Sequence, residues 1–258
     1  MKLGFFDSGI GGLSVLYCAM KMIPQAEFLY YADEENVPYG TKSKEEIIEY
    51  TDRAIRFLAD KGAQAVVVAC NTATSAAIKI MREKYDFPII GMEPAVKKAI
   101  DLYGEHKVLT IATPITVVGQ KMKGLIERVD KQHQVDLMPL PKLVTFAERC
   151  EYGEGAREYL RTEFASLDLS AYGSLVLGCT HFNLFKDVLR DIMPPGIHFV
   201  DGNEGTIKQL IRALTIKEGK EREQTTTYYF SGKEVTSPAE LQRLAGYLER
   251  LAEMATIE

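Results

Sequence analysis

Two of the four cysteines stand in matching surroundings, and their thiols could transfer protons. The cysteines are Cys18, Cys70, Cys150 and Cys179. Cys70 follows a Val-rich apolar run and Cys179 a second apolar run, 109 positions further along the chain. Asn-Thr follows the first and Thr-His the second, so each thiol has hydrogen-bonding neighbours. A single cysteine is usually a small buried core residue, but a matched pair of this kind favours a functional site.

Both cysteines come where a predicted strand ends and a helix begins. Ligands bind at this edge of open parallel sheets. The start of a helix lowers the pKa of a thiol and offers free amides to a carboxylate. Two thiols facing one substrate carbon can invert it, because one removes a proton and the other delivers one to the opposite face. One must be ionised and the other protonated, and nearby groups must create that difference. Asp7 and His181 are the candidates, although Asp7 could simply cap its turn and His181 could be structural.

The elements that position these residues alternate along the chain. Short apolar runs separated by amphipathic helical stretches predict an α/β fold with mostly parallel sheets flanked by helices. Ser43 and Glu46 form a capping-box pattern, and Gly62 ends the helix that follows. The predicted strands cover residues 3–6, 28–32, 65–69, 88–91, 108–112, 135–140, 175–178, 197–201 and 225–230. The predicted helices cover residues 13–22, 43–61, 71–84, 117–129, 154–166, 180–192, 206–216 and 239–252.

The chain also carries a weak internal repeat. The segment Ala65–Thr72 matches Ser174–His181, cysteine on cysteine. Lys2–Ser8 aligns with Lys107–Thr113 at nearly the same offset, 105 positions. Chance similarity between two α/β halves is one explanation, and a pair of related lobes that face one another is the other.

Composition excludes several classes of function. The net charge is −5, and no run of Lys and Arg interleaved with aromatic residues indicates nucleic-acid binding. We expect no membrane partner, because no apolar run approaches the roughly 20 residues that span a bilayer and the N-terminus lacks a signal-peptide pattern. The dispersed cysteines and the absence of a CxxC pair indicate free thiols in a reducing compartment. These features predict a cytoplasmic protein.

At these residues the chain resembles the glutamate racemase family, within the wider aspartate/glutamate racemase group. The motifs occur in the family's order with close to its spacing, and the resemblance covers essentially the whole chain. It departs from the family pattern at Phe182-Asn183, at Asp201–Asn203 and in the acidic stretch Asp33–Asn36. The matching segments are Phe6–Val15, Val37–Lys42, Ala69–Thr74 and Leu177–His181.

The resemblance implies an isomerase that supplies D-glutamate for peptidoglycan synthesis and cell shape, without pyridoxal phosphate, another cofactor or a metal. It implies two pseudo-symmetric lobes with the active site between them, residues 1–94 plus 205–258 and residues 95–204. It also implies a homodimer that needs no nucleic acid for activity.

The resemblance further assigns roles to individual residues. Cys70 would deprotonate D-glutamate with support from Asp7, and Cys179 would deprotonate L-glutamate with support from His181 and Glu148. Glu148 is placed by the Pro-containing segment that begins at Pro141. The substrate contacts carry over to Asp7, Ser8, Pro38, Tyr39, Gly40, Asn71, Thr72, Thr113, Thr116 and Thr180.

Several alternatives stay open. A racemase for aspartate or another amino acid could share this scaffold, because one methylene is worth only ~1–3 kcal/mol in recognition. A phosphate-binding loop at Gly9–Gly12 is disfavoured, since Ser14 stands where a third glycine is needed. A thiol redox protein would need a resolving cysteine nearby in the sequence. A protein that only binds is conceivable, but the intact Cys70 and Cys179 argue that catalysis is retained.

Overall fold

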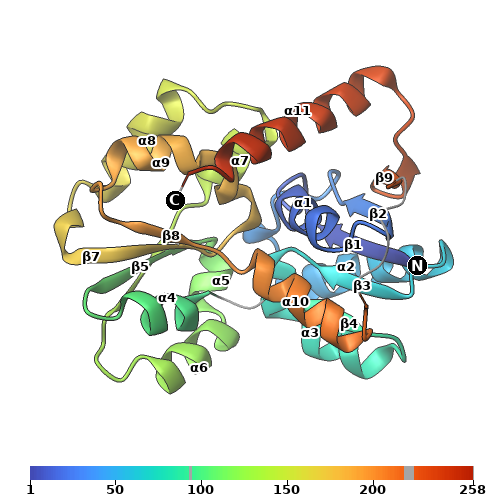
Figure 1. Ribbon diagram of the computed structural model, residues 1–258, viewed down its shortest axis with the longest axis horizontal. Helices are drawn as coiled ribbons and strands as arrows, with labels where there is room; N and C mark the ends of the chain where they lie inside the picture. The colour runs from blue at the N-terminus through green and yellow to red at the C-terminus, as the bar shows by residue number, and fades with distance from the viewer. Residues whose placement is uncertain (93–94, 218–223, 258) are drawn as a thin grey trace.

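The computed structural model describes residues 1–92, 95–217 and 224–257 and contains two sheets (Figure 1). The larger sheet has the strand order β10-β9-β2-β1-β3-β4. Its neighbouring strands run parallel except for the antiparallel hairpin of β9 and β10. Its strands are β1 (Lys2–Asp7), β2 (Glu27–Ala32), β3 (Ala65–Val68), β4 (Ile89–Gly91), β9 (Thr226–Phe230) and β10 (Lys233–Glu234).

The smaller sheet is entirely parallel within the described part of the chain and has the order β6-β5-β7-β8. In both sheets the central strands come from the runs that the repeat pairs with one another. The predicted α/β class is therefore confirmed. The strands are β5 (Lys107–Ala112), β6 (Val135–Pro139), β7 (Tyr172–Leu177) and β8 (His198–Val200).

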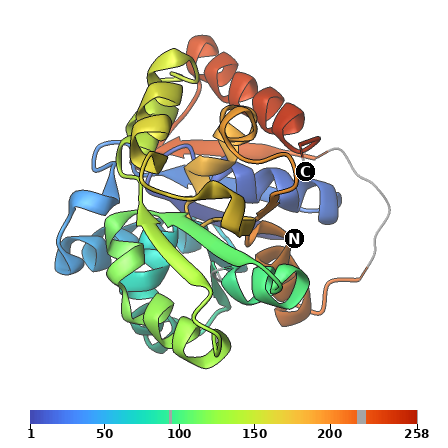
Figure 2. The ribbon, with the colours of Figure 1, turned by 90° about the vertical axis from the view of Figure 1, so that its left-hand side faces the viewer.

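Helices cover both faces of the sheets, as Figures 1 and 2 show from two directions. The long helices are α1 (Leu13–Met22), α2 (Lys44–Asp60), α3 (Asn71–Lys84), α6 (Gln120–Val129), α8 (Glu154–Phe164), α10 (Asn203–Ala213) and α11 (Pro238–Met254). The shorter ones are α4 (Val96–Tyr103), α5 (Pro114–Val118), α7 (Lys142–Glu148), α9 (Lys186–Ile192) and the 3₁₀ turns η1 (Tyr39–Thr41), η2 (Leu169–Ala171) and η3 (Thr180–Phe185).

The central strands of the larger sheet are apolar on both faces because both faces are covered. Successive side chains of a strand point to opposite faces. Phe5 accordingly packs in the core cluster that contains α1, whereas Phe6 packs in the cluster that contains α2 and α3. The first cluster continues into the second sheet through Leu109 and Leu175. One continuous apolar core therefore holds the two sheets together.

The structure corrects the sequence-based elements at several points. The helix predicted over residues 117–129 is broken, because Gly119 is extended and lies so near α3 that a Cβ there would be 2.3 Å from Ser75 Oγ. The helix predicted after Cys179 begins as the 3₁₀ turn η3. Helices α4 and α7 were not predicted at all. The capping box is confirmed, since Ser43 Oγ accepts from Glu46 N–H at 3.2 Å and Glu46 Oε2 accepts from Ser43 N–H at 2.8 Å.

The C-terminal segment returns to the larger sheet, where β9 pairs with β2, and then α11 crosses toward the smaller sheet (Figure 1). α11 packs against both α1 and η3. The predicted lobe boundary at residue 94 lies outside the described residues, so the division into residues 1–94 plus 205–258 and residues 95–204 stays a prediction. Within the described residues, no helix combines the length and the apolar character needed to cross a membrane.

Candidate active site

A cavity lies where the carboxyl ends of strands from both sheets meet. The loops that follow β1, β3, β5, β6 and β7 all contribute to its wall. Its lining residues are Ser8, Pro38, Tyr39, Gly40, Thr41, Cys70, Asn71, Thr72, Thr113, Pro114, Pro141, Val144, Cys179, Thr180 and His181.

Cys70 reaches this cavity from the larger sheet. It follows β3 and is the N-cap residue of α3, where its Sγ accepts a hydrogen bond from Ala73 N–H at 3.4 Å. Its thiol also donates to Ser8 Oγ at 3.6 Å. Burial, and secondly the charge of Asp7, raise the pKa of the Cys70 thiol. The lowering expected from the helix terminus is therefore wrong for Cys70, because loss of water outweighs the helix dipole and the hydrogen bonds.

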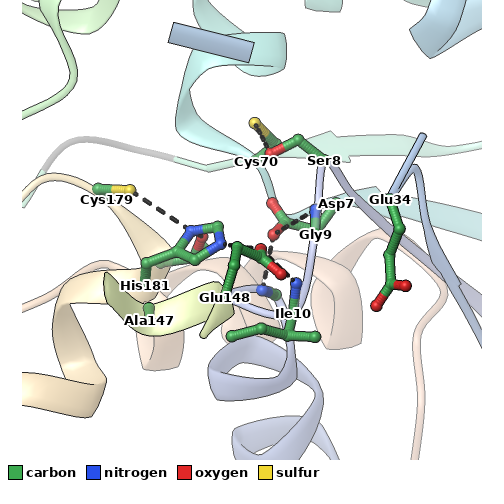
Figure 3. A network of polar contacts seen from close by, with 12 residues as sticks. Asp7, Ser8, Gly9, Ile10, Glu34, Cys70, Ala147, Glu148, Cys179 and His181 are labelled. Carbon is green, nitrogen blue, oxygen red and sulfur yellow. Dashed lines mark hydrogen bonds and ion pairs between the residues drawn. The ribbon is translucent and has the colours of Figure 1, made fainter. Parts of the chain in front are cut away.

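Cys179 reaches the same cavity from the smaller sheet and has a different environment (Figure 3). It follows β7, and its Sγ lies 3.7 Å from His181 Nδ1. His181 Nε2 lies 2.6 Å from Glu148 Oε1. Burial alone would lower the pKa of His181, but the contacts with Cys179 and Glu148 outweigh it and raise that pKa well above its ordinary value. The histidine is thus held as a cation between an acid and a thiol.

Asp7 ends β1 and is completely buried beside the glycine turn. Its Oδ2 accepts hydrogen bonds from Gly12 N–H at 2.8 Å and Gly9 N–H at 3.4 Å, whereas its Oδ1 has no partner. Burial raises the pKa of Asp7 from 3.8 to about 6, although the charge of His181 and the Gly12 N–H act in the opposite direction. Asp7 therefore caps the turn, which is one of the two roles the sequence left open. Its charge also raises the pKa of Cys70.

Comparison with known proteins agrees with this geometry. A profile of the family described as Asp/Glu/Hydantoin racemase matches residues 14–210. The chain belongs to that racemase family. It is 54% identical to a glutamate racemase of Campylobacter curvus over the full length of both proteins. Among solved structures it is similar to the glutamate racemase of Campylobacter jejuni, with a TM-score of 0.82 and 25% identity over 96% of this chain and 97% of that one.

A further solved structure carries the amino acid itself. The Escherichia coli glutamate racemase, in complex with L-glutamate and the activator UDP-MurNAc-Ala, matches with a TM-score of 0.82 and 28% identity. The match covers 97% of this chain and 94% of that one. The two-lobed racemase fold that the resemblance implies is thus the fold of this chain.

The resemblance places Glu148 in the site through the segment that begins at Pro141. The structure brings Glu148 into the polar network of this racemase-family chain. It is the last residue of α7, and its Oε1 accepts from Ile10 N–H at 3.0 Å in addition to its contact with His181. The glycine turn makes room for it. A Cβ at Gly9 would lie 1.8 Å from Glu148 Oε1, and one at Gly11 would lie 2.3 Å from His181 Nδ1. The turn therefore packs against Glu148 and His181 and is not a phosphate cradle.

The predicted substrate contacts fall into three groups. Eight of the ten line the cavity: Ser8, Pro38, Tyr39, Gly40, Asn71, Thr72, Thr113 and Thr180. Thr116 lies behind the wall, where its hydroxyl is 3.0 Å from that of Thr113. Asp7 lies beneath the turn and does not line the cavity. The hydroxyl of Tyr39 donates to Asp33 Oδ2 at 2.7 Å, and Asp33 is not among the residues that line the cavity.

Four lining residues were missed from the sequence: Thr41, Pro114, Pro141 and Val144. Thr41 and Pro141 stand inside motifs quoted for the racemase resemblance, so the motifs themselves were the available signal. Pro114 directly follows a predicted contact, Thr113. Val144 had no signal, because helix α7 was not predicted. Cys150, for which the sequence offered no partner, donates to Tyr247 Oη at 3.1 Å.

His181 supplies the basic side chain of the cavity wall. Among its described lining residues none is lysine or arginine. Hydroxyl groups and the amides of helix starts are the groups available to a carboxylate, as helix-terminus recognition requires. Within the described ranges, no group of three or more His, Cys, Asp or Glu side chains is arranged to hold a metal ion.

Proposed function

We propose that this chain interconverts L- and D-glutamate by proton transfer between two thiols, Cys70 and Cys179. One observation carries the proposal: two buried thiols, one from each sheet, line the same cavity and have different polar partners. A racemase needs two acid/base groups on opposite faces of one carbon. Residues that come from opposite lobes can meet that requirement without a change of fold.

The two thiols have different environments, which give them different roles. Burial and the charge of Asp7 favour the protonated form of Cys70, whereas His181, held as a cation by Glu148, lies against the sulfur of Cys179. In this state Cys179 takes the α-proton of L-glutamate and Cys70 delivers a proton to the opposite face. Reaction from D-glutamate runs through the reverse distribution of protons. The buried site keeps competing water away from both thiols.

Glutamate is the substrate that the family relationship favours. The Campylobacter curvus protein, 54% identical over the full length of both chains, carries the name glutamate racemase, and the Escherichia coli structure contains L-glutamate. The substrate's two carboxylates would be held by the hydroxyls of Ser8, Thr72, Thr113 and Thr180 and by the amides at the start of α3. The product serves peptidoglycan synthesis, as in the family. A preference for aspartate is the alternative, to be decided by assay.

The remaining roles follow from the contacts. We infer that Asp7 supports Cys70 through charge, and that His181 and Glu148 support Cys179 through direct contact. The reaction needs no cofactor, because thiols alone can carry the proton in both directions. The thiols must stay reduced, which supports a cytoplasmic location.

We also propose a homodimer in solution. The proposal rests on the resemblance to the glutamate racemase family. Size-exclusion chromatography with light scattering tests this. A single species with the mass of one chain would contradict it.

The reaction itself is tested by incubating the protein with L-glutamate in D₂O without added cofactor. Circular dichroism follows the loss of optical activity, and NMR follows deuterium at the α-carbon. We expect Cys70→Ser and Cys179→Ser each to slow racemisation by about 100-fold or more, the usual scale for losing an acid/base group. Cys18→Ser, which lies away from the cavity, is the control. Turnover of aspartate but not glutamate would overturn the substrate, and no exchange with either would overturn the racemase function.

A further inference from the structure

Helix α11 makes polar contacts with both sides of the site. Arg243 Nη2 lies 2.6 Å from Glu34 Oε1, in the loop that leads from β2 toward Pro38. Seven residues later, Arg250 Nη2 contacts both carboxylate oxygens of Asp187, at 2.8 and 3.0 Å, next to η3. Tyr247 lies between the two arginines, and residues spaced by three and four share one face of a helix. α11 is therefore tied to both halves of the molecule along one stripe.

Tyr247 makes the contact nearest to the site. Its side chain is buried, and its hydroxyl lies 3.2 Å from the carbonyl oxygens of both Ala147 and Glu148, to which it can donate. The same hydroxyl accepts from the thiol of Cys150. These carbonyls belong to the last turn of α7, and that of Ala147 also accepts from Cys150 N–H at 3.0 Å. The hydroxyl thus anchors the turn that bears Glu148.

That anchor matters because α7 has only seven residues. So short a helix is not stable by itself and takes its position from its neighbours. The side chain of Glu148 must reach His181 Nε2, and His181 must in turn reach Cys179 Sγ. We propose that Tyr247 is a positioning residue for the Cys179 side of the active site, acting through the backbone of Glu148. This inference rests on the proposed two-thiol racemase function.

Packing alone offers a competing explanation, because the Tyr247 ring also belongs to the apolar core. The variant Tyr247→Phe separates the two, since it keeps the ring and removes the hydroxyl. Tyr172→Phe is the matched control: the Tyr172 hydroxyl donates to Asp136 at 2.7 Å, at the other end of its strand from Cys179. Each variant loses one buried or partly buried hydroxyl, but only that of Tyr247 touches residues of the site.

Steady-state rates give the first readout. We expect Tyr247→Phe to lower kcat/KM about five-fold, the effect of one ordinary hydrogen bond when it acts on the transition state. The fall must be equal from L- and D-glutamate, because the two enantiomers have equal free energies. Tyr172→Phe should leave kcat/KM unchanged. In a double variant with Glu148→Gln, the Tyr247 substitution should cost nothing further, since the residue acts through Glu148.

Isotope effects identify the side affected. If the step at Cys179 slows, the α-deuterium effect on kcat/KM rises for the enantiomer that Cys179 deprotonates and falls for the other. The Glu148→Gln variant serves as the reference for that direction, and Tyr247→Phe should shift both effects the same way.

Three results would overturn the role of Tyr247. They are an unchanged kcat/KM in Tyr247→Phe, isotope effects that shift opposite to those of Glu148→Gln or not at all, and full additivity in the double variant. A wild-type protein that does not racemise glutamate would instead refute the proposed function.

Discussion

Asp7 gives the sharpest quantitative prediction, because the fold buries a carboxylate and leaves one of its oxygens without a partner. The substitution Asp7→Asn keeps the shape of the side chain and an oxygen that can accept from Gly12 N–H, but it removes the charge. We expect the variant to lose most racemase activity and yet to gain stability relative to wild type as the pH rises.

The magnitude follows from the raised pKa. In the unfolded chain the carboxyl ionises near 3.8, whereas in the folded protein it ionises near 6. Between these values the folded state holds a proton that the unfolded state has released, so the free energy of unfolding of wild type falls as the pH rises. At about 1.4 kcal/mol for each pH unit, the total loss is roughly 3 kcal/mol, complete above about pH 7. Asp7→Asn lacks this loss.

Urea unfolding at intervals from pH 3.5 to 7.5 measures the effect. The quantity that matters is the difference between variant and wild type, in which most other titrating groups cancel, as does any pH-independent cost of an unpaired amide. We expect this difference to rise by roughly 2 kcal/mol between pH 4 and pH 6 and to level off only near pH 7, where the folded carboxyl is ionised. Asp60→Asn, at an exposed position, controls for the chemistry of the substitution. A difference that stays flat, or that falls with pH, would refute the account of Asp7.

Two further predictions concern the walls of the site. Gly9→Ala places a methyl group where Glu148 Oε1 now lies, so the carboxylate must move away and activity should fall at least ten-fold with little loss of thermal stability. The control Gly124→Ala meets no atom within 4 Å and should leave activity unchanged. A fully active Gly9→Ala variant would contradict the packing argument. Tyr39→Phe removes the hydrogen bond to buried Asp33, which also pairs with Arg53. It should lower the free energy of unfolding by about 1.5–3 kcal/mol, as for bonds to charged groups. Urea unfolding that shows no change beyond about 0.5 kcal/mol would contradict a stabilising role for this hydrogen bond.

Much of the fold could be predicted because its signals are local. Val-rich β3 reads as a strand buried on both faces, and all four of its residues are buried. The Ser43 capping box fixes the start of α2. The failures come from elements whose cause is not local. α7 is too short to show a period, and Gly119 breaks a helical pattern only because α3 passes close by.

The same distinction between local and non-local causes applies to the residues of the site. Cys70, Cys179 and His181 could be proposed from the sequence because polar residues at strand ends converge on one edge of a parallel sheet. The direction of the pKa shift at Cys70 could not, because the helix terminus is visible in the sequence whereas the depth of burial is not. The contact between Tyr247 and the last turn of α7 joins residues about a hundred positions apart, and no pattern in either segment predicts it.

The glycine turn also links the two halves of the site. Its amides serve both: Gly12 N–H donates to Asp7 on the Cys70 side, and Ile10 N–H donates to Glu148 on the Cys179 side. The groups it separates affect one another through charge, since the His181 cation lowers the pKa of Asp7 and the Glu148 anion raises it. A proton that leaves His181 therefore makes Asp7 a stronger base. The turn and these charges therefore couple the Cys70 side of the site to the Cys179 side.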